Sequence, residues 1–372
     1  MPAFPAVALV VLLLGFTLSL ALTFAAIKLG LALDISAKPG GRRTHTRITS
    51  KLGALPLFGA FTLAVLAGRA FNVDTLDTVQ EPIRVAGVLI GGGVIFALAV
   101  LDDRFELPPA PQFGLQIIAA LIAFGSQVWI ERFTTPFTTP GKAGLIVLTE
   151  VLGQAAGYAV IAGLTLLWFL GMMNTVNFLD GVDGLASTVA LIATAVVAIH
   201  MLREGQFSVA LLPIALIGVL LGFLVFNWAP AKIFLGGGAL MLGWQLACVG
   251  IIGGAKIALL LLVMGLPIAD VLWQVIDRAR RGRNPTTAAD RGHLHLRLAD
   301  QGWPAARIVA LYATACILFG GVALLSLPPL AKLVTLIALL MAVIAVMVSL
   351  GRESSPEVVS TTGRGHGLTP KG

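Results

Sequence analysis

The sequence of 372 residues contains little charge: Asp, Glu, Lys and Arg make up 12% of it, about half the usual share in soluble domains. Hydrophobic residues make up 58%, and the mean hydropathy is +0.96. So few charges cannot cover a water-facing exterior, whereas a lipid bilayer requires no such cover. The composition therefore excludes a soluble globular protein and predicts an all-α polytopic membrane protein.

Cysteine is also scarce. Cys248 and Cys316 both lie in apolar stretches without metal-site spacing, so we expect two buried and inert side chains and no disulfide. No repeat of fixed period is visible along the chain. A transporter would often show repeats and would place ionisable residues near the middle of its helices. The acids of this chain gather near stretch ends instead, which argues against transport.

What the sequence has in abundance is apolar stretches, and eleven of them are long enough to cross a hydrocarbon core about 30 Å thick. They span about residues 6–28, 52–70, 84–101, 113–130, 155–173, 185–202, 207–226, 235–253, 255–273, 306–326 and 329–350. The first has no Lys or Arg before Lys28, unlike a signal peptide, so we expect it to be retained. We interpret residues 1–350 as one integral membrane domain and residues 351–372 as a disordered cytoplasmic tail.

The basic residues orient these helices. Eighteen of the 25 Lys and Arg lie in the tail or in loops after odd-numbered stretches. Because Lys and Arg concentrate on the cytoplasmic side, we expect these loops and the C-terminus in the cytoplasm and the N-terminus outside. The net charge of +7 then faces membrane lipid, and no nucleic acid partner is expected.

Four polar segments lie in the loops assigned to the cytoplasm. The first, residues 38–45, contains Lys38, Arg43 and His45 around two glycines. Such a basic segment can touch lipid headgroups, or it can clamp phosphates that approach the glycine backbone closely.

The second polar segment is the acid pair Asp102 and Asp103, placed where the third apolar stretch ends. Unpaired carboxylates are expensive at a membrane boundary unless the loop is solvated. If they are functional, they would collect a divalent cation, or one of them would deprotonate an acceptor.

The third polar segment repeats a polar residue every three positions, at Asn174, Asn177, Asp180 and Asp183. On a helix this spacing aligns the four side chains on one face. A helix cap followed by a turn would explain the two acids but not both asparagines. Oxygen ligands alone suit Mg²⁺, or Mn²⁺, rather than zinc.

The fourth polar segment, residues 277–307, combines several arginines with His293 and His295. Without a cysteine or a third histidine nearby, this set fits a phosphate-bearing anion better than zinc, with lipid headgroups as the simpler alternative. Acids, amides and cations on one membrane face together favour Mg²⁺-assisted phosphoryl transfer to a lipid acceptor.

Five ordered motifs carry a family resemblance: KPGGRRTH at 38–45, LDD at 101–103, NTVNFLDGVDGLA at 174–186, FNWAPAKIFLG at 226–236 and DRGHLH at 290–295. Over residues 34–304 the sequence resembles the polyprenyl-phosphate N-acetylhexosamine-1-phosphate transferases. The nearest branch is the bacterial undecaprenyl-phosphate N-acetylglucosaminyl-1-phosphate transferases, and the phospho-MurNAc-pentapeptide transferases of peptidoglycan synthesis are more distant.

The resemblance implies a bacterial inner-membrane enzyme with ten or eleven spans and a cytoplasmic site. Such enzymes use Mg²⁺ to move a sugar-1-phosphate from a UDP-sugar to undecaprenyl phosphate and release UMP. For this chain we expect UDP-GlcNAc as donor and a lipid-linked envelope glycan as product, such as the O-antigen of lipopolysaccharide or another product of cell wall biogenesis. The resemblance also suggests a homodimer.

The resemblance further implies roles for the motif residues. The catalytic set, which would serve the lipid phosphate or the metal, is Asp102, Asp103 and Asp180, with Asn177 and Asp180 at the metal. The set expected to bind the substrates is Lys38, Arg43, His45, Asn174, Asp183, Asn227, Arg283, His293 and His295. Within it, Asp183 would lie near the nucleotide, and Arg283 and the two histidines near the diphosphate and sugar.

The sequence departs from the family pattern at five places, of which Ser50 for a usual proline and Ala54 for a usual glycine are minor. The family usually reads F-x-G-D-x-G-S where this chain reads FLGGGAL, which fits best with the Asp deleted between Gly236 and Gly237. Leu296 stands for a third histidine, and Gln112 for a usually basic residue. Two alternatives therefore stay open: a catalytically impaired paralogue that keeps the fold and nucleotide-sugar binding, and a phospho-MurNAc-pentapeptide-type transferase.

Overall fold

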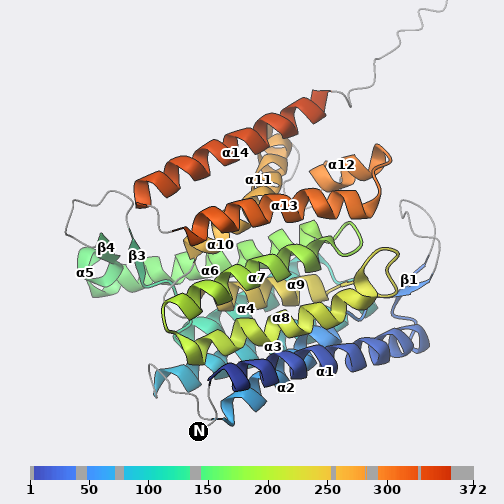
Figure 1. Ribbon diagram of the computed structural model, residues 1–372, viewed down its shortest axis with the longest axis horizontal. Helices are drawn as coiled ribbons and strands as arrows, with labels where there is room; N and C mark the ends of the chain where they lie inside the picture. The colour runs from blue at the N-terminus through green and yellow to red at the C-terminus, as the bar shows by residue number, and fades with distance from the viewer. Residues whose placement is uncertain are drawn as a thin grey trace, which may run out of the picture.

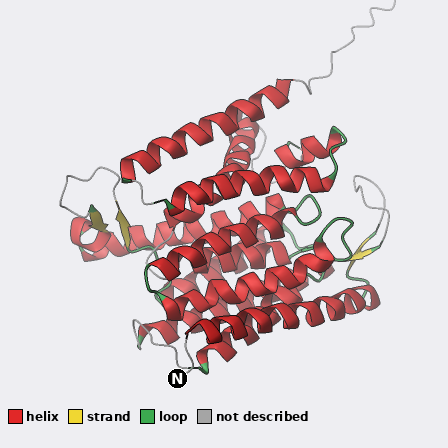
Figure 2. Cartoon of the chain, viewed as in Figure 1, coloured by secondary structure: helices red, strands yellow, loops and turns green. Residues whose placement is uncertain are grey.

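The computed structural model describes residues 4–38, 48–71, 79–134, 144–252, 257–280, 282, 292–325 and 328–352. Helices dominate it, as Figure 2 shows. Their bounds are α1 Phe4–Ala32, α2 Ala54–Arg69, α3 Gln80–Phe105, α4 Pro109–Gly125, α5 Leu148–Leu152, α6 Gln154–Leu179, α7 Leu185–Arg203, α8 Phe207–Asn227, α9 Gly238–Ile251, α10 Ile257–Val263, α11 Gly265–Arg280, α12 Leu294–Asp300, α13 Ala305–Leu324 and α14 Pro329–Arg352. The prediction of an all-α membrane protein is confirmed.

The count of eleven spans is not confirmed. Among the described residues, six helices are long and apolar enough to cross a membrane: α1, α3, α6, α7, α8 and α13. The predicted span at 255–273 is divided into α10 and α11, which meet at an angle of 79° and make a seventh only if counted together. Each of the eleven apolar stretches contains a helix, but α2, α4 and α9 have only 16, 17 and 14 residues.

Four very short strands were not predicted, because two or three residues carry no readable alternation. Strands β1 (Ser36–Ala37) and β2 (Thr49–Ser50) pair antiparallel, as do β3 (Arg132–Thr134) and β4 (Leu145–Val147). The two small sheets lie at opposite ends of the helical bundle (Figure 1). The predicted boundary of the tail at residue 350 falls in the last turn of α14, and residues 353–372 lie outside the described part.

Helix α9 forms the centre of the bundle, and all of its 14 residues are buried. It contacts α3 and α6 most closely, and also α2, α7 and α10. At about 1.5 Å per residue, α9 is about 21 Å long, so it is shorter than a hydrocarbon core. A helix enclosed by protein does not need to reach both membrane surfaces, because its ends are covered by neighbouring chain.

Helices α1, α8, α7, α13 and α14 lie side by side in that order in Figure 1, and each contacts the next. Behind them lie α9, α3 and α4. The C-terminal ends of α1, α3, α6 and α8 meet the N-terminal ends of α9 and α13 at the end of the bundle that carries β1. This end, where Figure 1 places several loops, carries the site described next.

Candidate active site

A cavity of about 1190 Å³ opens at this end of the bundle. Its polar lining comes from four segments that are distant in the sequence: Lys51, Asp102 and Asp103, Asn177 to Asp183, and the loop from Asn227 to Gly237. Apolar side chains complete it, from α1 on one side and from α12 and α13 on the other: Ile27, Leu31, Leu296, Ala299, Trp303 and Ile308. The cavity therefore has a charged and polar region that is flanked on two sides by apolar side chains.

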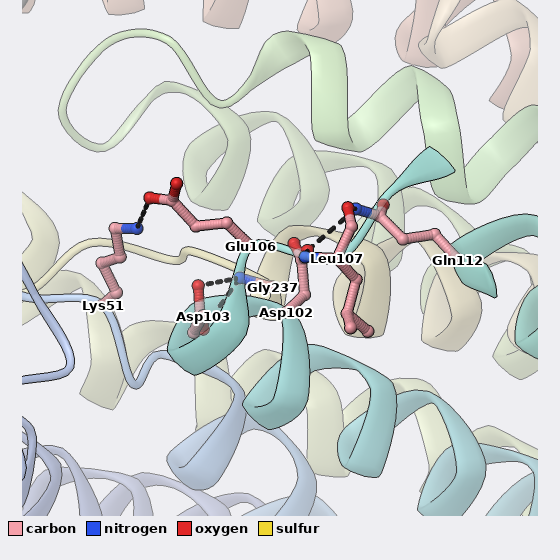
Figure 3. A network of polar contacts seen from close by, with 7 residues as sticks. All are labelled: Lys51, Asp102, Asp103, Glu106, Leu107, Gln112 and Gly237. Atoms are coloured by element: carbon pink, nitrogen blue, oxygen red, sulfur yellow. Dashed lines mark hydrogen bonds and ion pairs between the residues drawn. The ribbon is translucent and has the colours of Figure 1, made fainter. Parts of the chain in front are cut away.

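Asp102 and Asp103 sit in the last turn of α3 and make different contacts (Figure 3). Asp102 is half-buried, and its Oδ1 accepts hydrogen bonds from the backbone N–H of Leu107 at 2.9 Å and from Gln112 Nε2 at 2.8 Å. Helix α3 ends there because Glu106 adopts a φ of +50° and the next residues are Leu107 and two prolines. The end of α3 thus fixes Asp102 at the cavity wall.

Asp103 is buried, and both of its carboxylate oxygens lie 3.0 Å from the backbone N–H of Gly237. Gly237 is the N-cap of α9, so Asp103 accepts a hydrogen bond at the positive end of a helix. Nearby, Lys51 Nζ lies 3.9 Å from Glu106 Oε1 (Figure 3). Asp103 therefore anchors the start of the central helix to α3.

Helix α6 ends at Leu179, which corrects the interpretation that all four residues of the Asn/Asp repeat lie on one helix face. Asn177 lies in the last turn, Asp180 caps the helix, and Asp183 lies in the turn before Gly184, whose φ of +74° starts α7. Burial, together with the negative charge of Asp183, raises the pKa of Asp180 to about 7. The Oδ2 of Asp183 accepts a hydrogen bond from the backbone N–H of Ala231 at 2.9 Å.

Asn174 lies one turn before Asn177, outside the cavity lining. Its Nδ2 donates to Gln116 Oε1 at 2.9 Å and to the carbonyl of Leu170 at 2.8 Å. These contacts tie α6 to α4. Asn174 was predicted to bind substrate; that role stays a prediction, and the contacts describe a helix-packing residue.

Asn227, the last residue of α8, lines the cavity but is 2% exposed. Its Oδ1 accepts a hydrogen bond from Ser187 Oγ at 2.8 Å, and its Nδ2 donates to the carbonyl of Ile233 at 3.0 Å. With both ends of the amide engaged, Asn227 holds the loop from Trp228 to Gly237 against α7.

Gly236 and Gly237, between which the family has an additional Asp, are tightly packed. A Cβ on Gly236, whose φ is +54°, would lie 2.4 Å from the carbonyl oxygen of Lys51. A Cβ on Gly237 would lie 2.5 Å from the Cα of Ala99. Neither position can take a larger side chain without movement of backbone, so the carboxylate that the family pattern has here cannot be restored by substitution.

The basic residues are dispersed. Lys232 lines the cavity and is exposed. Lys38 lies outside the lining and pairs at 2.9 Å with Asp34, whose pKa it lowers. The predicted substrate residues Arg43, His45 and Arg283 lie outside the described residues.

His293 and His295 are buried behind the cavity wall, not in it. Both face Asp270 of α11, a residue outside all five sequence motifs. An acid inside an apolar stretch is itself an indication of a role, because a bilayer or a protein interior tolerates it only with partners. Burial lowers the pKa of His295.

No three His, Cys, Asp or Glu side chains converge as a metal cage among the residues that the structure describes. Magnesium ions, however, are usually held by one or two carboxylates together with water and substrate phosphates. Asp180 suits such a shared magnesium ion. Burial and the neighbouring charge of Asp183 make its ionised carboxylate unfavourable, and a bound cation would stabilise that negative charge. Asn177, exposed in the same cavity, adds an amide oxygen. The residues present therefore fit a magnesium ion that is shared with a phosphate ligand.

In the described part of the chain, six long apolar helices in one bundle define a multi-pass membrane protein, with acids and amides gathered in a cavity beside apolar walls. Residues 85–254 match the model of Glycosyl transferase family 4. A probable undecaprenyl-phosphate N-acetylglucosaminyl 1-phosphate transferase of Bacillus subtilis is 30% identical over 284 residues, covering 74% of this chain and 72% of its own.

Two further relatives come from related groups. The decaprenyl-phosphate N-acetylglucosaminephosphotransferase of Mycolicibacterium smegmatis is 30% identical, with 74% of this chain and 71% of its own covered. The phospho-N-acetylmuramoyl-pentapeptide-transferase of Bacillus velezensis is 34% identical over 62% of this chain and 70% of its own. The chain therefore belongs to the family of polyprenyl-phosphate sugar-1-phosphate transferases, which are phosphotransferases, as the motifs predicted.

Proposed function

We propose that this protein transfers N-acetylglucosamine-1-phosphate from UDP-GlcNAc to undecaprenyl phosphate, releases UMP, and so starts a lipid-linked glycan of the bacterial cell envelope. The observation that carries the proposal is the cavity, because its acids and amides from α3 and α6 lie between apolar walls from α1 and α13. Its volume of about 1190 Å³ exceeds the roughly 300–1,000 Å³ of most single-ligand sites, which suits two substrates at once.

The reaction forms one P–O bond and breaks another. An oxygen of the lipid phosphate attacks the phosphorus that carries the sugar, and the bond from that phosphorus to the bridging oxygen breaks, so UMP leaves with that oxygen. Asp102, oriented by Leu107 and Gln112, is placed to direct the lipid phosphate or to take its proton. Lys51 and Lys232 offset the charge of the bound phosphates.

Asn177 and Asp180 would hold the magnesium ion. When bound, Mg²⁺ supplies positive charge to the diphosphate. With the family Asp absent after Gly236, we expect fewer protein ligands and a weaker affinity for the metal than in relatives that have it.

The proposal is tested by UMP release from the purified protein with undecaprenyl phosphate, Mg²⁺ and UDP-GlcNAc. A second protein carries an Asp inserted between Gly236 and Gly237, because substitution at either glycine meets backbone. We expect the insertion to bind Mn²⁺, measured by its electron paramagnetic resonance spectrum, at least tenfold more tightly than the original chain, since each added carboxylate ligand favours the cation.

The outcomes separate the alternatives. Turnover by the original chain supports the proposed function and shows that the remaining ligands suffice. Turnover by the insertion variant alone indicates an impaired paralogue with an intact fold. No turnover by either, but turnover with UDP-MurNAc-pentapeptide, would favour the second candidate, to which the 34% identity with the Bacillus velezensis relative gives weight.

We also propose a membrane orientation, a number of crossings, a product and an assembly for this protein. The cavity faces the cytoplasm of a bacterial inner membrane, the N-terminus is outside, and the chain crosses the membrane eleven times if α2, α4, α9, α14 and the bent pair α10–α11 each count as one crossing. Lipopolysaccharide O-antigen is a suitable product, and a homodimer is the proposed assembly.

A further inference from the structure

We propose that Asp270 is a positioning residue, which fixes the orientation and the proton position of His293 and holds the α12 segment on the turn that carries Asp180. This inference rests on the proposed function for its effect on turnover, but not for its structural content. Asp270 lies in α11, outside the cavity, and is 2% exposed.

The carboxylate of Asp270 has two hydrogen-bond donors on the α12 segment, by which we mean the N-cap His293 together with helix α12. Its Oδ1 accepts the backbone N–H of Leu294 at 2.9 Å, and its Oδ2 lies 3.1 Å from Nδ1 of His293. A carboxylate only accepts, so Nδ1 of His293 carries the hydrogen. In a neutral imidazole with hydrogen on Nδ1, the lone pair lies on Nε2, because the bond made by one ring nitrogen sets the tautomer.

Two nearly parallel rings pack against the ring of His293 and restrain its plane. Its centroid lies 5.6 Å from that of Phe178 at 24° and 5.6 Å from that of His295 at 23°. Phe178 stands between Asn177 and Asp180 in the sequence. The stack therefore restrains the plane of the ring, Asp270 fixes its rotation within that plane, and both connect the histidines to the motif of α6.

His295 continues this contact to the turn itself. Its Nε2 lies 2.6 Å from the point where a Cβ on Gly181 would stand, so only glycine allows the approach. Its Nδ1 lies 3.8 Å from Oδ2 of Asp270, and neither ring nitrogen has a hydrogen-bond partner. The next residue, Leu296, faces the cavity. The α12 segment thus packs His295 against the turn that carries Asp180, and its Leu296 lines the cavity.

The consequence for the reaction is indirect. Removing the Asp270 carboxylate would release the backbone of Leu294 and the ring of His293 together, and so loosen the wall behind Asp180. Residues that orient groups of a metal site typically change activity by about 10-fold to 100-fold. We expect kcat to fall by that amount in Asp270→Asn, with KM for the UDP-sugar changing less than about threefold.

The test combines turnover with a direct view of the rings. The chain has five histidines, so a sample labelled with ¹⁵N-histidine in detergent gives few signals, and His293→Gln assigns the relevant pair. In the original protein we expect hydrogen on Nδ1 of His293. In Asp270→Asn the side-chain oxygen stays on Leu294 N–H, so its NH₂ faces Nδ1, and we expect the hydrogen to move to Nε2.

Glu81 provides a matched control at the opposite end of the bundle. It is a buried carboxylate of α3 that binds Arg69 and, at 2.8 Å, Ser208 Oγ. Glu81→Gln is expected to lower the thermal midpoint and to leave the histidine signals and kcat as they are. Asp270→Glu keeps a carboxylate and is expected to retain hydrogen on Nδ1 even if Asp270→Asn does not fold.

Three results would overturn the inference: an unchanged His293 signal in Asp270→Asn, an equal loss of kcat in Asp270→Asn and Glu81→Gln, or hydrogen on Nε2 in the original protein. If the original protein releases no UMP with either donor, the proposed function fails. The ¹⁵N spectra still decide whether Asp270 positions His293.

Discussion

At the scale of single residues, neighbours in the sequence can have unrelated tasks. Both Asp102 and Asp103 line the cavity, but Asp102 is half-buried and accepts from a side chain and a loop N–H, whereas Asp103 is buried and accepts from the N–H at the start of α9. Sequence motifs treat them as one acid pair. Their surroundings differ: the carboxylate of Asp102 is partly open to the cavity, whereas that of Asp103 anchors the start of a helix.

This difference predicts unequal effects on stability. Asp103→Ala leaves the N–H of Gly237 buried without its acceptor, which costs about 1–3 kcal/mol. Asp102→Ala frees an N–H and an amide that the open cavity can hydrate, so we expect a loss of less than about 1 kcal/mol. Thermal unfolding in detergent, followed by tryptophan fluorescence, measures both. Equal midpoints for the two variants would contradict the assignment.

His295 gives a pH dependence of stability. Because its pKa in the folded protein is lowered by burial, the unfolded chain binds a proton below about pH 6.5 that the folded chain does not. Stability from this group is therefore present above that pH and is lost as the pH falls. We expect the thermal midpoint to fall between pH 7.5 and pH 5.5, and to fall less in His295→Gln. The same slope in both proteins would exclude His295 as the source.

At the scale of elements, close packing of small residues joins α1 to α8. The buried face of α1 repeats small residues at Gly15, Ser19, Thr23, Ala26 and Gly30. A Cβ on Gly15 would lie 2.7 Å from the carbonyl of Ala215 on α8. Such faces let helix backbones approach where lipid offers no competing hydrophobic gain.

The contact predicts a sharp difference between two helical glycines. A Cβ on Gly218 would lie 2.2 Å from the carbonyl of Leu12, so Gly218→Ala forces α1 and α8 apart and should cost about 1–3 kcal/mol. Gly171 of α6 has no atom within 4 Å of an added Cβ, so Gly171→Ala should be neutral or stabilise by up to about 1 kcal/mol. Comparison of the two thermal midpoints checks this, and a Gly218→Ala midpoint at or above that of Gly171→Ala would argue against it.

The short helices α5 and α12 lie outside the predicted stretches. The longer helices could be predicted because each needs a long apolar stretch, and all eleven stretches contain one. Their ends and breaks could not. Helix α9 can be short because protein covers it. The bend between α10 and α11 lies beside Gly265 and Pro267, which the apolar pattern does not distinguish from their neighbours.

At the scale of the molecule, the site could be predicted only where spacing implies proximity. Asn177, Asp180 and Asp183 come together because they share one helix end, and Asp102 joins them at the same end of the bundle. The contact of Asp270 with His293 spans 23 residues and depends on how α11 packs, which no local pattern contains. Asn174 and Asn227 match the motifs, yet their side-chain amides form hydrogen bonds to other residues of the bundle. A motif gives the identity of a residue but not its hydrogen-bond partner.

At this scale we predict that the two ends of the bundle lie on opposite sides of the membrane. The connection between α7 and α8 and the connection between α12 and α13 lie at opposite ends of the bundle (Figure 1). The first holds the exposed Glu204, and the second holds the exposed Gln301. Both native cysteines are buried, so a single introduced cysteine is the reactive thiol of each variant. The proposed orientation has the cavity end in the cytoplasm, so a membrane-impermeant maleimide should label Glu204→Cys in intact cells and Gln301→Cys only after permeabilisation. The reverse pattern would place the cavity outside the cell and remove the cytoplasmic setting of the proposed reaction. Labelling of both in intact cells would mean that the ends are not separated by a membrane, against the bundle described here.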